Sequence, residues 1–153
     1  LVESNERFNE SDSIEPGDRV VVVDTPIGKL GLAVCYDLRF PELFRAMIDQ
    51  GAEVISLPAA FTAVTGRAHW DILVRARAVE NLSYVIAAAQ GGFHIKGRET
   101  YGHSMIVDPW GSVLDQRDRG NGFAIAEINH NFQATTRRNF PCLSHRHIHC
   151  RGD

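Results

Sequence analysis

The sequence predicts an α/β domain, because short apolar runs of strand length alternate with segments whose apolar residues recur at helical spacing. The chain has 153 residues, of which 44% are hydrophobic, so it is long enough to form one domain around its own core. Strand and helix alternate in the first part, which favours parallel pairing. The later part contains short strands separated by turn residues, which favours antiparallel pairing.

The expected elements are, in order, a loop over 1–18, a hairpin of strands 19–24 and 29–35, a helix over 41–50, a strand over 53–58, a helix over 69–81, a strand over 83–90, short strands over 104–108, 113–116 and 123–128, and a helix over 132–139. The turn Thr25-Pro26-Ile27-Gly28 separates the two β-branched runs of the hairpin. Pro41 and Gly51 bracket the first helix, as is typical of helix starts and stops.

The remaining elements follow from periodicity and turn signals. Residues 53–58 and 83–90 are short apolar runs, typical of buried strands. The second helix places Trp70, Leu73 and Arg77 at helical spacing. The loop at Gly91-Gly92 and a turn at 109–111 divide the later strands from one another.

Charge and composition exclude several classes of partner. The chain carries 16 basic and 19 acidic residues, a net charge of −3, so nucleic acid and anionic membranes are not expected partners. No apolar run approaches the roughly 20 residues that span a bilayer. Residues 1–10 lack the apolar centre of a secretory signal, and three cysteines without a pairing pattern favour the reducing cytoplasm.

Cys35 is the candidate nucleophile. It ends the apolar run Gly31-Leu32-Ala33-Val34 and precedes Tyr36-Asp37, which places a thiol at the carboxyl end of a strand. A thiol there can attack a carbonyl carbon while the following backbone amides receive the negative charge that develops on oxygen. On this evidence alone, a buried cysteine that acts as a small hydrophobic residue remains the alternative.

The segment from Gly31 to Glu42, Gly-Leu-Ala-Val-Cys-Tyr-Asp-Leu-Arg-Phe-Pro-Glu, resembles the nucleophile segment of the nitrilase superfamily of carbon-nitrogen hydrolases. The similarity is closest to the Nit branch, which includes deaminated-glutathione amidases and omega-amidases. Further segments agree in order and spacing: Asp24-Thr25-Pro26, Pro58-Ala59-Ala60-Phe61-Thr62, Gly66 with His69-Trp70, the run 75–81, and the runs 101–104 and 107–111.

This resemblance implies a four-layer α-β-β-α sandwich, with residues 1–146 in the hydrolase domain and 147–153 as a polar tail. The family's catalytic set is a glutamate, a lysine and a cysteine, with a second glutamate close by. Glu10 resembles that second glutamate, although a solvated loop residue is the alternative. Lys29 and Lys96 are the only lysines and stand in the wrong segments. The chain is therefore expected to be the carboxyl-terminal part of such a domain and to be inactive alone.

The resemblance also implies a reaction. The Cys35 thiolate would attack the carbonyl of a small carboxylic acid amide, and the backbone amide of Tyr36 would bind the oxyanion. Ammonia would leave, and water would cleave the thioester, with no metal or organic cofactor. The expected partners are thus a small amide, water and a second subunit in a homodimer or larger assembly. The competing function is a binding or assembly module that has this fold but no turnover.

Several neighbouring residues have two interpretations. Phe61 and Thr62 follow the strand after the nucleophile, where α/β folds place substrate contacts, and a plain loop role is an equal alternative. Asp37 and Arg39 are expected to brace the loop beyond Cys35. Arg77 and Glu80 are expected to form an ion pair one helical turn apart, and His103 is expected to be a hydrogen-bonded residue at a strand start.

The segment from Cys142 to Cys150 gathers five Cys and His side chains, but their spacing matches no zinc-site pattern, so no metal site is expected.

Overall fold

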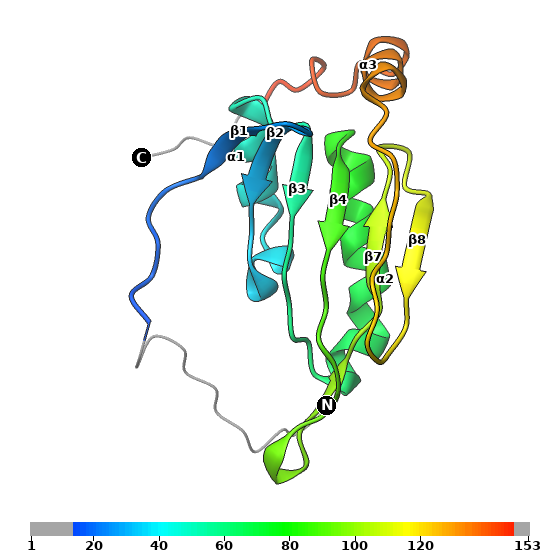
Figure 1. Ribbon diagram of the computed structural model, residues 1–153. Helices are drawn as coiled ribbons and strands as arrows, with labels where there is room; N and C mark the ends of the chain where they lie inside the picture. Colours follow the sequence, from blue (N-terminus) through cyan, green and yellow to red (C-terminus); the bar gives the residue numbers. More distant parts are fainter. Residues whose placement is uncertain (1–13, 149–153) are drawn as a thin grey trace.

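The computed structural model describes residues 14–148, apart from the side chain of Lys96. A six-stranded sheet in the order β1-β2-β3-β4-β7-β8 forms one layer, and two helices, α1 and α2, cover one of its faces (Figure 1). The elements are β1 (Val22–Thr25), β2 (Gly28–Leu32), the 3-10 helix η2 (Cys35–Arg39), α1 (Pro41–Asp49), β3 (Val54–Ser56), α2 (Ala63–Asn81), β4 (Tyr84–Ala87), β5 (Gly91–Phe93), the 3-10 helix η3 (Ile95–Gly97), β6 (Glu99–Tyr101), β7 (Ser104–Val107), β8 (Val113–Arg117) and α3 (His130–Asn139).

The sheet is mixed, as the sequence predicts. Strands β2, β3 and β4 are parallel neighbours, because α1 and α2 carry the chain back between them. The β1–β2 hairpin and the pairs β4–β7 and β7–β8 are antiparallel. The carboxyl ends of β2, β3 and β4 therefore meet at one edge of the sheet.

The core lies between the sheet and the two helices. The side chains of α1 that enter it are Phe44 and Met47, both fully buried, and α2 contributes Trp70 and Val74. From the strands and the segments after them come Ala33, Ile55, Leu57, Val85, Ala87, Met105 and Val107. Burial of a large apolar side chain contributes about 1.5–3 kcal/mol, so these contacts fix the helices on this face.

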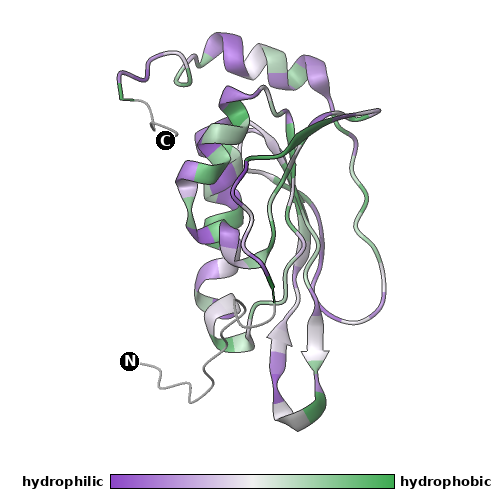
Figure 2. Ribbon diagram, turned by 90° about the vertical axis from the view of Figure 1, so that its left-hand side faces the viewer, coloured by the Kyte–Doolittle hydropathy of each residue, from purple (hydrophilic) through white to green (hydrophobic). Residues whose placement is uncertain are grey.

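The opposite face of the sheet carries a second row of side chains. Leu32, Ser56, Ile86 and Ile106 are register partners across β2, β3, β4 and β7, so they share a face. Leu32 is 43% exposed, whereas Ile106 is 8% exposed. Seen edge-on, the segment 118–129 that joins β8 to α3 bows out on this side of the sheet, away from α1 and α2 (Figure 2).

The strand predicted over 123–128 is wrong, because this segment forms no ladder with the sheet. The Ile125 amide donates to the Asp115 carboxylate, with 2.7 Å from N to Oδ2, and not to a neighbouring strand. Phe123 and Ile125 are 79% and 70% exposed. The apolar alternation is genuine, but a side chain takes the place of the backbone partner that a strand needs.

The second helix begins at Ala63, six residues earlier than the predicted start at 69. Thr62 precedes it in extended conformation, as N-cap residues do. Gly66 is required here because a β-carbon would stand 2.3 Å from the Tyr101 Cβ. Within residues 14–148, no helix is both long enough and apolar enough to cross a lipid bilayer.

The loop predicted after Gly91 is a hairpin. Strands β5 and β6 pair antiparallel, with η3 at the tip. The amide of Tyr101 donates to the Phe61 carbonyl, which ties the hairpin to the start of α2. The sequence does not predict β5, because two of its three residues are glycines and glycine is depleted in strands.

Helix α3 closes the end of the sheet opposite to that hairpin. The Arg137 guanidinium donates to the carbonyls of Leu82 and Ala52, and Gln133 donates to the Leu82 carbonyl as well. Burial lowers the pKa of Arg137, while Glu53 acts in the opposite direction. These side chains satisfy carbonyls just beyond the ends of α1 and α2, so α3 is attached by polar contacts as well as by packing.

Candidate active site

Cys35 lies two residues after Ala33, the last small core residue beyond β2, and is the first residue of η2. Its φ of 47° is in the left-handed region, which costs a residue other than glycine about 1–2 kcal/mol. Its amide donates to the Pro58 carbonyl over 2.8 Å. This bond to the segment after β3 fixes a strained turn at the carboxyl end of β2, with the thiol half-buried.

The backbone of η2 leaves one amide available beside the thiol. The first hydrogen bond of this helix runs from Asp37 N to the Val34 carbonyl, at 3.0 Å. The amide of Tyr36 precedes that bond and therefore has no partner within the helix. The Asp37 carboxylate accepts from Val34 N at 2.8 Å, which confirms that Asp37 braces the loop. An amide in this position can donate to an oxyanion formed next to Cys35.

A hollow of about 970 Å³ opens in front of Cys35. It lies at the edge where the carboxyl ends of β2, β3 and β4 meet, the usual position of ligand sites in open α/β sheets. A bridge between Ala59 and Ala89 continues the β3–β4 pairing into its wall. The lining residues are Val34, Cys35, Tyr36, Pro58, Ala59, Ala60, Ala88, Ala89, Gln90, Arg98 and Ser104.

Arg39 joins η2 to α2 beside this hollow. Its guanidinium carbon lies 5.2 Å from the centre of the Phe61 ring and 5.6 Å from that of Tyr36, and its Nη1 lies 3.3 Å from His69 Nδ1. These contacts confirm the bracing role expected of Arg39.

The structure gives Phe61 and Thr62 different surroundings. The Phe61 ring is 7% exposed and meets the Trp70 ring edge to face. Thr62 immediately precedes α2, and its hydroxyl lies 2.9 Å from that of Thr65. Neither residue lines the hollow in front of Cys35, as far as the described residues show.

Arg77, on α2, is hydrogen-bonded to the backbone of η2. Its Nε and Nη2 both donate to the Leu38 carbonyl, at 3.0 and 2.7 Å, and its Nη1 lies 2.9 Å from Glu80 Oε1. The predicted Arg77–Glu80 ion pair is thereby confirmed. The contact with Leu38 is new, and since Arg77 is 5% exposed, α2 fixes the nucleophile turn through a buried cation.

Lys29 does not approach the thiol, and the side chain of Lys96 lies outside the described part of the chain. Lys29 stands at the amino end of β2 and pairs with Asp24 at 3.8 Å. Cys35 follows Lys29 by six positions along a nearly extended chain, a span of about 20 Å. Glu10 lies outside the described residues, as does Cys150. None of the described residues that line the hollow carries a carboxylate.

Three site residues went unpredicted or were placed without a role. Gln90 and Arg98 line the hollow, and Ser104 bonds both the amide and the carbonyl of Ala89 across it. The position of Gln90 at the carboxyl end of the predicted buried strand 83–90 was a usable signal. Arg98 had none, because its hairpin was not predicted. His103 precedes β7 and accepts from Trp70 Nε1 through its carbonyl, so its structural role is confirmed.

The comparisons with known proteins agree with this geometry. A family model described as carbon-nitrogen hydrolase matches residues 2–138. The chain is 51% identical to a deaminated glutathione amidase from Yersinia enterocolitica over 91% of its own length and 49% of that protein. The C. elegans NitFhit protein superposes with a TM-score of 0.89 at 47% identity, covering 96% of this chain and 36% of that one.

A more distant structure shows chemistry at a cysteine. It is a mutant of an amidase from Nesterenkonia sp. AN1, in which acrylamide has added to the active site cysteine. It matches 86% of this chain and 53% of its own, with a TM-score of 0.70 at 30% identity. The chain spans about half the length of the curated relatives it matches. The resemblance to nitrilase-type hydrolases is confirmed, and the chain belongs to the carbon-nitrogen hydrolase family.

Proposed function

We propose that this protein hydrolyses the amide bond of a small carboxylic acid amide, with Cys35 as nucleophile. The observation that carries the proposal is the position of Cys35, held in a left-handed turn at the head of η2 and facing the hollow at the carboxyl edge of the sheet. The name of the Yersinia relative and the labelled cysteine of the Nesterenkonia amidase support it.

The reaction runs in two halves. The thiolate sulfur of Cys35 attacks the amide carbon, and the electron pair of the carbonyl moves to oxygen, where the Tyr36 amide donates to it. When the tetrahedral intermediate collapses, the carbon–nitrogen bond breaks and the nitrogen leaves with a proton, as ammonia from a primary amide. Water then cleaves the thioester to a carboxylic acid and restores the thiol.

The thiol needs a base, because a cysteine with an ordinary pKa near 8.5 is mostly protonated at pH 7. By family resemblance, a glutamate acts as this base and a lysine is the second donor to the oxyanion. Glu10 matches the family's second glutamate. We propose that the Glu10 carboxylate orients the lysine or the substrate nitrogen. The proposed reaction requires no metal or organic cofactor.

The substrate class and setting are parts of the same proposal. We propose an omega-amide of a keto acid or of a glutathione derivative as the substrate, and the name of the relatives, deaminated glutathione amidase, supports the second of these. We propose that Phe61 and Thr62 contribute to substrate binding indirectly. Phe61 packs against the Arg39 guanidinium, and the Thr62 hydroxyl contacts that of Thr65 at the start of α2. We place the protein in the cytoplasm, where free thiols such as those of Cys35 and Cys142 persist, and in a homodimer or larger assembly.

Electrophilic labelling tests the nucleophile. The protein as its gene encodes it is incubated with acrylamide at pH 7, and each cysteine-containing peptide is quantified by mass spectrometry. We expect Cys35 to be labelled at least tenfold faster than Cys142, because a nucleophilic cysteine has more thiolate character than an ordinary one. Equal labelling rates at the two cysteines would mean that Cys35 is not activated, and would favour a binding or assembly module.

A further inference from the structure

The segment that joins β8 to α3 contains the one Asn-Gly pair of the sequence, Asn121-Gly122. Both residues are exposed, and neither belongs to a helix or a strand. In such a pair the backbone nitrogen of the glycine readily attacks the side-chain amide of the asparagine, because glycine has no β-carbon to shield that nitrogen or to restrict the backbone. The pair is therefore a candidate for an intramolecular reaction.

The groups that would react are unpaired in the structure. Within residues 14–148, neither the Asn121 side chain nor the Gly122 amide has a hydrogen-bond partner. Asn139 is also exposed, but the amide that follows it, Phe140 N, donates to the Thr136 carbonyl at 2.9 Å. A peptide nitrogen held in such a bond is not available to the side chain before it. The two exposed asparagines thus differ in the feature that ring closure requires.

Arg117 contacts the peptide group between Asn121 and Gly122. Its Nη2 donates to the Asn121 carbonyl over 3.0 Å. The attacking species is the deprotonated Gly122 nitrogen, and its negative charge is shared with that carbonyl oxygen because the peptide group is delocalised. A guanidinium that donates to the oxygen stabilises this anion. A β-carbon on Gly122 would stand 2.8 Å from Arg117 Nε, so the arginine lies close along the reacting peptide.

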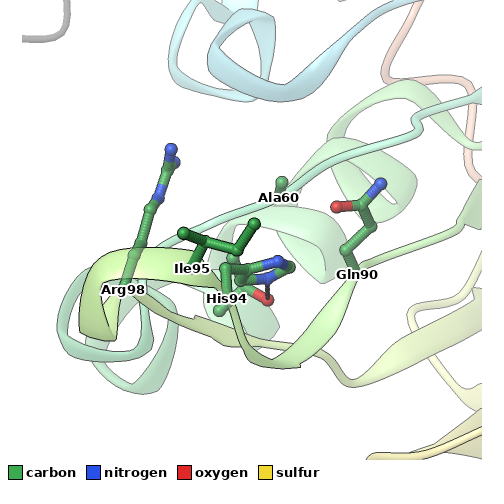
Figure 3. Close-up of a pocket in the computed structure, with 6 residues that line it drawn as sticks. Ala60, Gln90, His94, Ile95 and Arg98 are labelled. Atoms are coloured by element: carbon green, nitrogen blue, oxygen red, sulfur yellow. Dashed lines mark hydrogen bonds between the residues drawn. The ribbon is translucent and has the colours of Figure 1, made fainter.

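The pair also lines a hollow of about 430 Å³. Gln90 and His94 form part of its wall, and both side chains also line the neighbouring hollow of about 360 Å³ drawn in Figure 3. Gln90 lines the hollow in front of Cys35 as well. Asn121 and Gly122 therefore have space for a ring and access for water, next to the proposed catalytic site but outside its lining.

We propose that Asn121 is a site of spontaneous deamidation and that Arg117 promotes the reaction. The Gly122 nitrogen loses its proton and bonds to the side-chain carbonyl carbon of Asn121. The bond from that carbon to the amide nitrogen breaks, and this nitrogen leaves with the proton as ammonia. Water then opens the succinimide ring at either carbonyl, which gives aspartate or isoaspartate at this position. Either product adds a negative charge beside the hollow, and isoaspartate also lengthens the backbone by one carbon.

Ageing of the folded protein at neutral pH, followed by peptide mapping with mass spectrometry, tests the proposal. We expect the aspartyl and isoaspartyl peptides of Asn121 to accumulate about tenfold faster than those of Asn139, whose following amide is hydrogen-bonded. Arg117→Met should slow the reaction at Asn121 about fivefold, as for the loss of one charge-assisted hydrogen bond in an exposed position.

Arg119→Met is the matched control. Arg119 lies on the same segment but pairs with Glu99 at 2.8 Å, so its loss should leave the rate at Asn121 within about twofold. In urea, where the contact with Arg117 is lost, the Arg117→Met and unmodified proteins should react at the same rate. Equal accumulation at Asn121 and Asn139 would overturn the proposal. So would a folded Arg117→Met protein that reacts as fast as the unmodified one, or a difference between them that persists in urea.

Discussion

Replacing Cys35 with alanine is expected to lower kcat for amide hydrolysis by about 10⁴-fold or more, with little change in the binding of substrate. Alanine keeps the β-carbon and the turn but removes the sulfur that forms the thioester. The remaining groups, including the Tyr36 amide, can still polarise a carbonyl, but they have no covalent route to offer. Steady-state kinetics on the protein as its gene encodes it, with a primary amide as substrate, measures the effect.

Cys142→Ala is the matched control. Cys142 is a free cysteine that follows α3, at the far end of the chain from η2, so the same change of side chain should leave kcat within about twofold. Undiminished turnover by the Cys35→Ala protein would be incompatible with the proposed mechanism. A comparable loss in both variants would point to a general effect of cysteine removal instead of a nucleophile.

The second large effect is expected at Arg77. Arg77→Met should lower the free energy of unfolding by about 3 kcal/mol, because it removes two donors from a buried carbonyl and breaks an ion pair that is mostly shielded from water. The loss includes the contact between the guanidinium and the Phe44 ring, 5.3 Å from its centre. Urea unfolding followed by tryptophan fluorescence measures the change.

Arg75→Met separates burial from charge. Arg75 lies on the same helix, with its side chain about half exposed and paired with Asp71 at 3.7 Å, so the same substitution should cost about 1 kcal/mol or less. Glu80→Gln should cost less than Arg77→Met, since it removes the ion pair but leaves both bonds from Arg77 to the Leu38 carbonyl in place. If the Arg77 and Arg75 variants unfold at the same urea concentration, the buried contact with η2 contributes nothing measurable.

The parallel centre of the sheet was predictable because each of its elements carries a local signal. Pro41 starts α1, Gly51 follows its end, and the strands on either side are apolar runs. The hairpin of β5 and β6 was not predictable, because Gly91 and Gly92 have no side chains to give a periodic pattern. Its position depends on backbone bonds to the residues before α2, which are distant in sequence.

The site divides in the same way. Cys35 could be chosen from the sequence, because a thiol after an apolar strand has a mechanism attached to it. The bond between Arg77 and Leu38 joins residues 39 positions apart, and only the packing of α2 under η2 creates it. Residues 123–128 show the opposite error, in which a valid alternation of apolar residues lacks a strand to pair with.

The left-handed backbone of Cys35 has a consequence for the evolution of this protein. Glycine adopts a φ of 47° without the steric cost that a β-carbon incurs, so Cys35→Gly should be about 1 kcal/mol more stable than Cys35→Ala in urea unfolding. A lineage selected for thermal robustness alone would then drift toward glycine at this position and lose its thiol. The persistence of cysteine in such a turn would have to be maintained by selection for turnover, against a small but constant pull toward a more stable, inactive chain.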